Sequence, residues 1–122
     1  MLSGRVILIV DDDEILRDFL AKACAKEGAV VMTASGGNEA FKIIQETLID
    51  LVVSDIRMPQ GDGISLLKNI RSIDGPQPGV ILISGFNDQR IVKAAGFESV
   101  TVISKPFGQQ EIIKLMVPKL NE

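Results

Sequence analysis

The chain has 122 residues and a net charge of −3, and its 46% hydrophobic and 24% charged residues are typical of a single globular domain, not of a disordered chain. The mild charge argues against a surface that attracts nucleic acid, and no apolar run reaches the length of a bilayer span. The absence of histidine excludes a His-ligated zinc site and a phosphohistidine on this chain, and the single cysteine excludes an internal disulfide.

Apolar, β-branched runs alternate with segments of helical periodicity along the whole chain. We predict strands at residues 5–10, 29–34, 50–55, 79–84 and 99–104. We predict helices near residues 14–27, 38–45, 63–72, 87–95 and 109–120. The first run lacks a small-residue cleavage site, so we interpret it as a strand and not as a signal peptide.

Five strand–helix units with nearly continuous apolar strands predict a parallel sheet that is covered by helices on both faces. Right-handed crossovers then favour a doubly wound, three-layer α/β fold. In the first helix, apolar residues at helical spacing predict one buried face that also holds Cys24 as a small core residue. These residues are Ile15, Leu16, Phe19, Leu20 and Ala23.

Polar side chains follow four of the five predicted strands, at the edge of an open parallel sheet where ligands bind. In chain order these are Asp11, Asp12 and Asp13 after the first strand, Ser54 and Asp55 at the end of the third, Ser84 at the end of the fourth, and Ser104 and Lys105 at the end of the fifth. The strand ends therefore bring carboxylates, a hydroxyl and an ammonium group to one edge.

The carboxylates of Asp11, Asp12 and Asp55 would repel one another unless a cation lay among them. Oxygen ligands without histidine or cysteine favour Mg²⁺, or Mn²⁺, over zinc or copper. Such a site suits a phosphoryl group, because the metal and Lys105 can neutralise its oxygens and Ser84 can donate a hydrogen bond. Asp55 is the best candidate for the carboxylate that attacks phosphorus.

Other acidic residues have simpler interpretations as helix caps. We predict that Asp13 caps the first helix and Asp62 the third. For the fourth helix, the cap is either Asn87 or Asp88.

Four motifs at these strand ends resemble those of the receiver domains of bacterial two-component response regulators. They are "VDDD" at 10–13, "SDIRMPQGDG" at 54–63, "LISG" at 82–85 and "SKPF" at 104–107. The resemblance covers essentially all of the chain. It implies a five-stranded sheet of order 2-1-3-4-5 and one receiver domain over residues 1–122. It also implies a cytoplasmic protein that is not itself an enzyme.

The resemblance implies that Asp55 becomes an aspartyl phosphate. Asp12 and Asp55 resemble direct Mg²⁺ ligands, while Asp11 resembles a ligand that acts through water. The backbone carbonyl of Arg57 resembles a further ligand.

Lys105 is similar to the lysine that contacts the phosphoryl group, and Ser84 to the hydroxyl that moves toward it. The bond between Lys105 and Pro106 is often cis in such domains. Val102 stands where the family usually has an aromatic ring, so we do not expect a ring-flip readout at this position.

The implied phosphoryl donor is a sensor histidine kinase or a phosphotransfer protein. An output domain or a downstream protein would receive the signal, and a homodimer is left open. Arg57 and Phe86 lie two residues beyond Asp55 and Ser84, on the path of the hydrolytic water in such domains. We hypothesise that both obstruct this water and prolong the phosphorylated state.

Two alternatives belong to other classes of protein. A phosphatase of the haloacid dehalogenase type would use Asp11 as nucleophile and Asp13 as acid/base, although no acidic pair follows Lys105 to complete its metal site. A receiver-like interaction domain that is never phosphorylated is the second. A flavodoxin-like flavin carrier is excluded, because acids follow the first strand where its phosphate loop needs hydroxyls and glycines.

Overall fold

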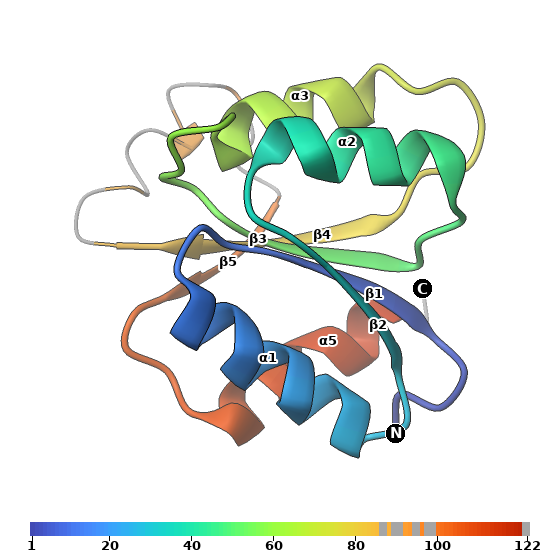
Figure 1. Cartoon of the computed structure of the whole chain (residues 1–122), viewed down its shortest axis with the longest axis vertical. Coiled ribbons are helices and arrows are strands. Elements are labelled where there is room, and N and C mark those ends of the chain that lie inside the picture. The colour runs from blue at the N-terminus through green and yellow to red at the C-terminus, as the bar shows by residue number, and fades with distance from the viewer. Residues whose placement is uncertain (86–87, 89–91, 94–95, 97–99, 121–122) are drawn as a thin grey trace.

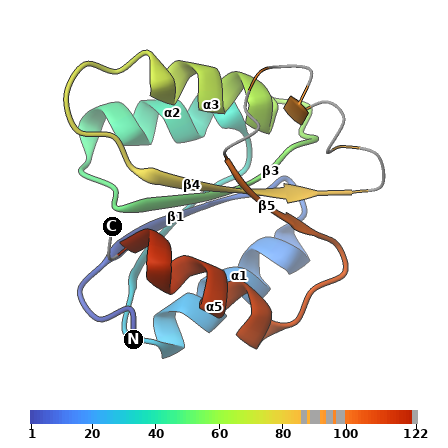
Figure 2. The same cartoon turned by 180° about the vertical axis from the view of Figure 1, so that it is seen from behind.

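The computed structural model describes residues 1–85, 88, 92–93, 96 and 100–120, which form a central sheet between two layers of helices (Figures 1 and 2). The five strands are all parallel and lie in the order β2-β1-β3-β4-β5. They are β1 (Val6–Val10), β2 (Val30–Ala34), β3 (Leu51–Asp55), β4 (Gly79–Ser84) and β5 (Thr101–Ser104). The predicted doubly wound fold and its strand order are confirmed.

Four helices of the described residues cover the sheet. They are α1 (Glu14–Lys26), α2 (Gly37–Glu46), α3 (Gly63–Arg71) and α5 (Gln109–Leu120). Their bounds agree with the predicted helices to within one residue at each end. The predicted helix at 87–95 falls largely outside the described residues.

Successive side chains of β1 point to opposite faces of the sheet and enter two separate cores. Ile7 and Ile9 belong to the cluster beneath α1 and α5. Leu8 and Val10 belong to the cluster beneath α2 and α3. The strand is apolar at every position because both of its faces are buried, which explains the unbroken hydrophobic run in the sequence.

The buried face of α1 is narrower than the sequence predicts. Cys24 is fully buried, as predicted, and its thiol lies 3.6 Å from the sulfur of Met116 in α5. Ile15 is 83% exposed and Phe19 is 39% exposed, so the prediction that they share this buried face is wrong. Helical spacing identifies the residues that share one face of α1, but packing against α5 decides how many of them are buried.

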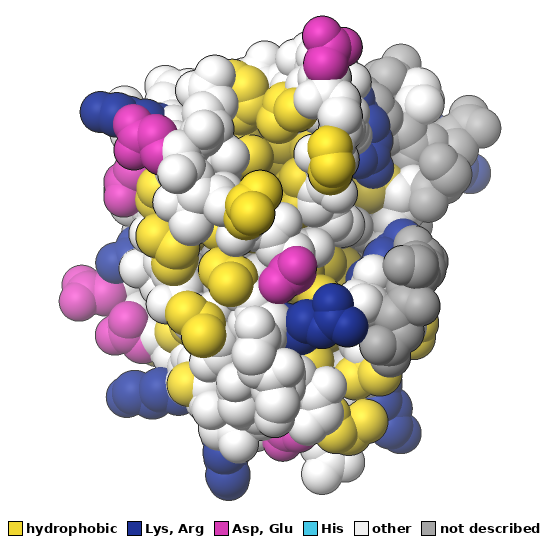
Figure 3. Space-filling model, turned by 90° about the vertical axis from the view of Figure 1, so that its right-hand side faces the viewer, with side chains coloured by type: hydrophobic (Ala, Val, Ile, Leu, Met, Phe, Trp, Pro, Cys, Tyr) yellow, Lys and Arg dark blue, Asp and Glu magenta, His cyan; other side chains and the backbone are white. Residues whose placement is uncertain are grey.

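The strands begin at the side of the molecule that Figure 3 shows, where hydrophobic side chains are spread among a few charged ones. A cavity of about 390 Å³ lies at this edge, lined by Arg5, Asp50, Arg71, Gln77, Pro78, Gly79, Val80, Lys119 and Leu120. Among the described residues, no helix combines the length and the apolar character needed to cross a membrane.

Candidate functional site

The acidic residues of the site lie where two neighbouring strands end, on the side of the sheet opposite to the one where the strands begin. Strands β1 and β3 pair directly, with Val10 opposite Ser54, so the chain leaves both strands at the same edge. One carboxylate oxygen from each of Asp11, Asp12 and Asp55 lies within 4.8 Å of the other two. The strand order reverses between these strands, which is where open parallel sheets bind their ligands.

Asp11 is completely buried, and its two carboxylate oxygens have different surroundings. Oδ1 accepts a hydrogen bond of 2.9 Å from the backbone N–H of Asp13. Oδ2 is buried and has no hydrogen-bond partner within the part of the chain that the structure describes. Burial raises the pKa of Asp11 from 3.8 to about 6; the charges of Asp55 and Asp12 add to this rise, and the Asp13 N–H and Lys105 oppose it.

Lys105 brings a positive charge to the acidic cluster from β5. Its Nζ donates a hydrogen bond of 3.0 Å to Oδ2 of Asp55, whose side chain is 8% exposed. Burial lowers the pKa of Lys105, but the hydrogen bond and the charge of Asp55 outweigh that effect, so the pKa lies above its usual value. The Lys105–Pro106 peptide bond is cis, in agreement with the resemblance.

Ser84 reaches the same edge from β4, but its hydroxyl is directed along the sheet toward β5. The buried Oγ lies 3.4 Å from the carbonyl oxygen of Ile103 and 3.2 Å from Oγ of Ser104. In the structure, the hydroxyl of Ser84 is therefore engaged with β5.

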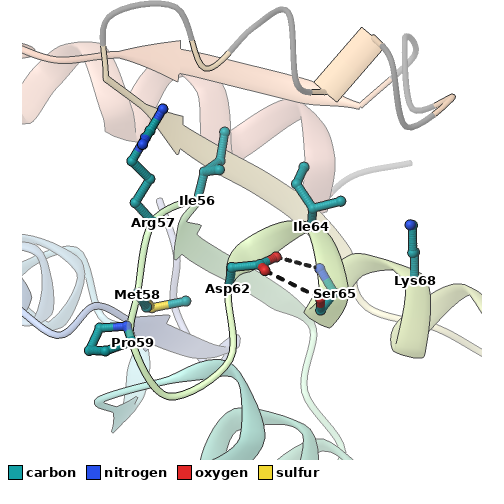
Figure 4. A pocket seen from close by; sticks show the side chains of 8 residues that line it. All are labelled: Ile56, Arg57, Met58, Pro59, Asp62, Ile64, Ser65 and Lys68. Carbon is teal, nitrogen blue, oxygen red and sulfur yellow. Dashed lines mark hydrogen bonds between the residues drawn. The ribbon is translucent and has the colours of Figure 1, made fainter.

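Arg57 follows Asp55 in the β3–α3 loop, and its side chain forms an ion pair that the sequence did not predict. Its Nε lies 2.6 Å from Oδ1 of Asp88, a carboxylate that is only 1% exposed. Figure 4 shows the Arg57 side chain extending away from Met58 and Pro59. The cavity beside this loop has a volume of about 660 Å³, and Asp11, Asp12 and Asp55 are not among its lining residues.

Gly63, the first residue of α3, and Gly37, the first residue of α2, both pack closely against the β3–α3 loop. A Cβ atom on Gly63 would collide with the backbone oxygen of Asp55, so only glycine allows α3 to begin here. The N–H of Gly63 donates to the carbonyl of Ile56 at 2.8 Å, and the N–H of Gly37 in α2 donates to the carbonyl of Gly61 at 2.8 Å. The backbone that follows Asp55 is therefore hydrogen-bonded to the first residue of α3 and to the first residue of α2.

The predicted helix caps Asp13 and Asp62 are confirmed. The Asp13 carboxylate accepts from the N–H groups of Ile15 and Leu16, and the Asp62 carboxylate accepts from the N–H of Ser65 at 2.7 Å. Asn87 lies outside the described residues. Asp88 directs its carboxylate to Gly85 and Arg57.

The acidic cluster fits a hard divalent cation. All its donor atoms are carboxylate oxygens, and the buried Oδ2 of Asp11 offers a lone pair that no described residue uses. Oxygen donors of this kind suit Mg²⁺, which commonly binds one or two carboxylates and keeps some of its water. The backbone carbonyl of Arg57 is the further ligand that the resemblance implies.

The structure thus brings Asp11, Asp12, Asp55 and Lys105 together, as the sequence predicts. Phe86, which we predict to obstruct the hydrolytic water, lies outside the described residues. Sequence reasoning missed the role of Gly63, although its place after a turn was a usable signal, and considered Asp88 only as a cap.

Comparisons with known proteins agree with this geometry. A family model described as the response regulator receiver domain matches residues 7–117. An uncharacterized 14.6 kDa protein from Leptolyngbya boryana is 32% identical over 119 residues, which cover 94% of this chain and 89% of that protein. The receiver domain of NtrX from Brucella abortus has a similar crystal structure, with a TM-score of 0.84 and 30% identity over 94% of this chain and 98% of that one.

Other relatives are much longer than this chain. The DNA-binding transcriptional regulator NtrC from Salmonella typhimurium is 32% identical over 111 residues, which cover 91% of this chain but only 24% of that protein. The chain therefore spans about a quarter of the length of such a regulator.

Proposed function

The chain belongs to the response regulator receiver domain family, and from this premise we propose that it accepts a phosphoryl group on Asp55. The single observation that supports this role is the position of the Asp55 carboxylate, which joins the Asp11 and Asp12 carboxylates and is hydrogen-bonded to Lys105. The donor in this proposal is a phosphohistidine on a sensor histidine kinase or a phosphotransfer protein.

In the proposed reaction, a carboxylate oxygen of Asp55 forms a bond to phosphorus while the bond between phosphorus and the donor's nitrogen breaks. The electron pair of that bond stays on the imidazole of the donor. Lys105 stands 3.0 Å from Asp55 and would keep its positive charge beside the phosphoryl oxygens. Ser84 would rotate away from β5 to donate a hydrogen bond to one of them.

Asp11, Asp12 and Asp55, with the backbone carbonyl of Arg57, are the residues that we propose for holding Mg²⁺. A bound Mg²⁺ ion would neutralise charge on the transferred group and orient it for in-line attack. The unpartnered buried oxygen of Asp11 supports this assignment.

The structure gives reason to set the phosphatase alternative aside. That mechanism needs the Asp13 carboxylate as a free acid/base group. Here the carboxylate caps α1 through the N–H groups of Ile15 and Leu16. Receiver domains generally act as signalling modules, and we propose the same role, without an enzymatic activity of its own, for this chain.

The proposal is tested by incubating the protein with Mg²⁺ and a small phosphodonor and locating the modification by mass spectrometry. We expect one phosphoryl group on Asp55, and no labelling of Asp55→Asn. Asp11→Asn should still be labelled on Asp55 at high Mg²⁺ concentration. Asp74→Asn serves as the control, because it removes the same charge from an exposed side chain. Labelling that depends on Asp11 and not on Asp55 would favour the phosphatase.

We further propose that residues 1–122 act as one receiver unit in the cytoplasm, with an output domain or a downstream protein as the recipient of the signal. The longer relatives support this arrangement. The homodimer and the hypothesis that Arg57 and Phe86 slow hydrolysis stay predictions; equal rates of phosphate loss from wild type and Phe86→Ala would contradict the latter.

A further inference from the structure

Asp88 is a buried carboxylate outside the acidic cluster, and it links the two loops that flank Asp55. Its Oδ2 accepts a hydrogen bond of 2.7 Å from the backbone N–H of Gly85, which directly follows Ser84 at the end of β4. Its Oδ1 accepts one of 2.6 Å from Nε of Arg57, two residues beyond Asp55. One side chain that is 1% exposed therefore holds a donor from each loop.

A structural role accounts for only part of this arrangement. An acidic side chain that binds the backbone N–H three residues earlier is a common way to begin a helix. That role needs one carboxylate oxygen and no cation from another loop. The second oxygen of Asp88 instead makes a charge-assisted bond to Arg57, which ties the segment after β4 to the loop that carries the acceptor.

A phosphoryl group on Asp55 would add a second anion at the same edge of the sheet. Such a group offers strong acceptor oxygens that attract arginine side chains and backbone N–H groups. The N–H of Gly85 and the Nε of Arg57 are both bound to Asp88 in the structure. The two anions would therefore compete for the same donors.

Building on the proposed function, we propose that Asp88 is a positioning residue that acts as an internal acceptor in the unphosphorylated domain. It holds Gly85 and Arg57 in the resting arrangement, and both bonds open when Asp55 is phosphorylated. Asp88 thereby favours the unphosphorylated state, and its charge raises the free energy of the phosphorylated one. A ligand shifts such an equilibrium only by its difference in affinity for the two states, so removing Asp88 should strengthen binding of a phosphoryl mimic.

The test measures the affinity of the whole chain for beryllofluoride in the presence of Mg²⁺, for wild type, Asp88→Asn and Asp88→Ala. Asn keeps the shape of the side chain and removes its charge. We expect about tenfold tighter binding for Asp88→Asn, the size that the loss of one charge-assisted hydrogen bond in the resting state would produce. A purely structural role would instead loosen the site and weaken binding.

NMR of the backbone and arginine N–H groups supplies a second readout. In wild type, the resonances of the Gly85 N–H and the Arg57 Nε–H should shift when beryllofluoride binds. In free Asp88→Asn they should already be displaced in the direction of these bound positions. This measurement keeps the proposal testable should Asp88→Ala fail to fold.

Asp74→Asn makes the same charge change on an exposed side chain, and its affinity should equal that of wild type. Equal or weaker binding by Asp88→Asn, with normal binding by wild type, would overturn the proposed role of Asp88 and leave Asp55 as the acceptor. Failure of wild type itself to bind beryllofluoride with Mg²⁺ would instead contradict the proposed function.

Discussion

Asp11 combines complete burial with a carboxylate that is only partly hydrogen-bonded. Ionising such a group is unfavourable, because water no longer solvates the charge and Asp55 and Asp12 lie nearby. This unfavourable free energy of ionisation raises the pKa of Asp11 to about 6. A cation at the site would offset it, so the stability of the domain should depend on both pH and metal ions.

In protein freed of divalent ions, we expect the free energy of unfolding to fall as pH rises from about 4 to about 6. The folded protein keeps a proton on Asp11 that the unfolded chain releases near its ordinary pKa of 3.8, so the folded state binds more protons in this window. The loss should be at most about 3 kcal/mol. Urea denaturation at several pH values, with a chelator present, measures it.

Asp11→Asn isolates this effect from the titration of the other carboxylates. The variant should lack the additional loss of stability between these pH values and should bind Mg²⁺ more weakly. Identical pH profiles for the variant and wild type would show that ionisation of the Asp11 carboxyl does not lower the free energy of unfolding.

At the level of the elements, the start of α3 packs against the end of β3. Gly63 is the first residue of α3, and its backbone packs directly against the carbonyl of Asp55. Its N–H also donates to the carbonyl of Ile56, which leaves no room to move the helix without moving the loop. The start of α3 thus packs directly against the backbone of Asp55 and Ile56.

Gly63→Ala should therefore destabilise the protein by about 1–3 kcal/mol, because the added methyl group meets backbone and not a flexible side chain. It should also weaken Mg²⁺ binding, since the strain is relieved by shifting Asp55. Urea denaturation and Mg²⁺ titration check both effects. Gly108→Ala is the matched control, because a Cβ atom there meets nothing within 4 Å. If both variants behave alike, close packing at Gly63 is not what positions Asp55.

For the whole molecule, stability depends on two cores that share one sheet. Neighbouring residues of β1 point into different cores, so this interior strand carries buried side chains on both of its faces. The acidic cluster is built directly on the end of this strand. Loss of packing in either core should therefore affect the position of Asp11 and Asp12.

Leu8→Ala and Ile9→Ala should each lower the free energy of unfolding by about 2–5 kcal/mol, although the two residues are adjacent in sequence. Val30→Ala on the edge strand β2 should cost less than about 1 kcal/mol, because Val30 is 55% exposed. Urea denaturation of the three variants tests this contrast. Tolerance of either β1 substitution would mean that one face of the sheet is not a packed core.

The sequence alone determined the order of the elements, the class of the sheet and the edge at which Asp11, Asp12, Asp55 and Lys105 meet. These features follow from local pattern, because unbroken apolar runs identify strands that are buried on both faces and parallel strands end at a common edge. The caps at Asp13 and Asp62 are equally local, since each carboxylate binds backbone N–H groups two or three residues away.

Only the tertiary structure decided the contacts between segments that are distant in the chain. The ion pair of Arg57 with Asp88, the direction of the Ser84 hydroxyl toward β5 and the exposure of Ile15 all depend on which side chains neighbouring elements place there. Periodicity identifies the face of an element but not the rotamer or the partner of each side chain. Those are set when the layers pack, and the proposed role of Asp88 arises at that level.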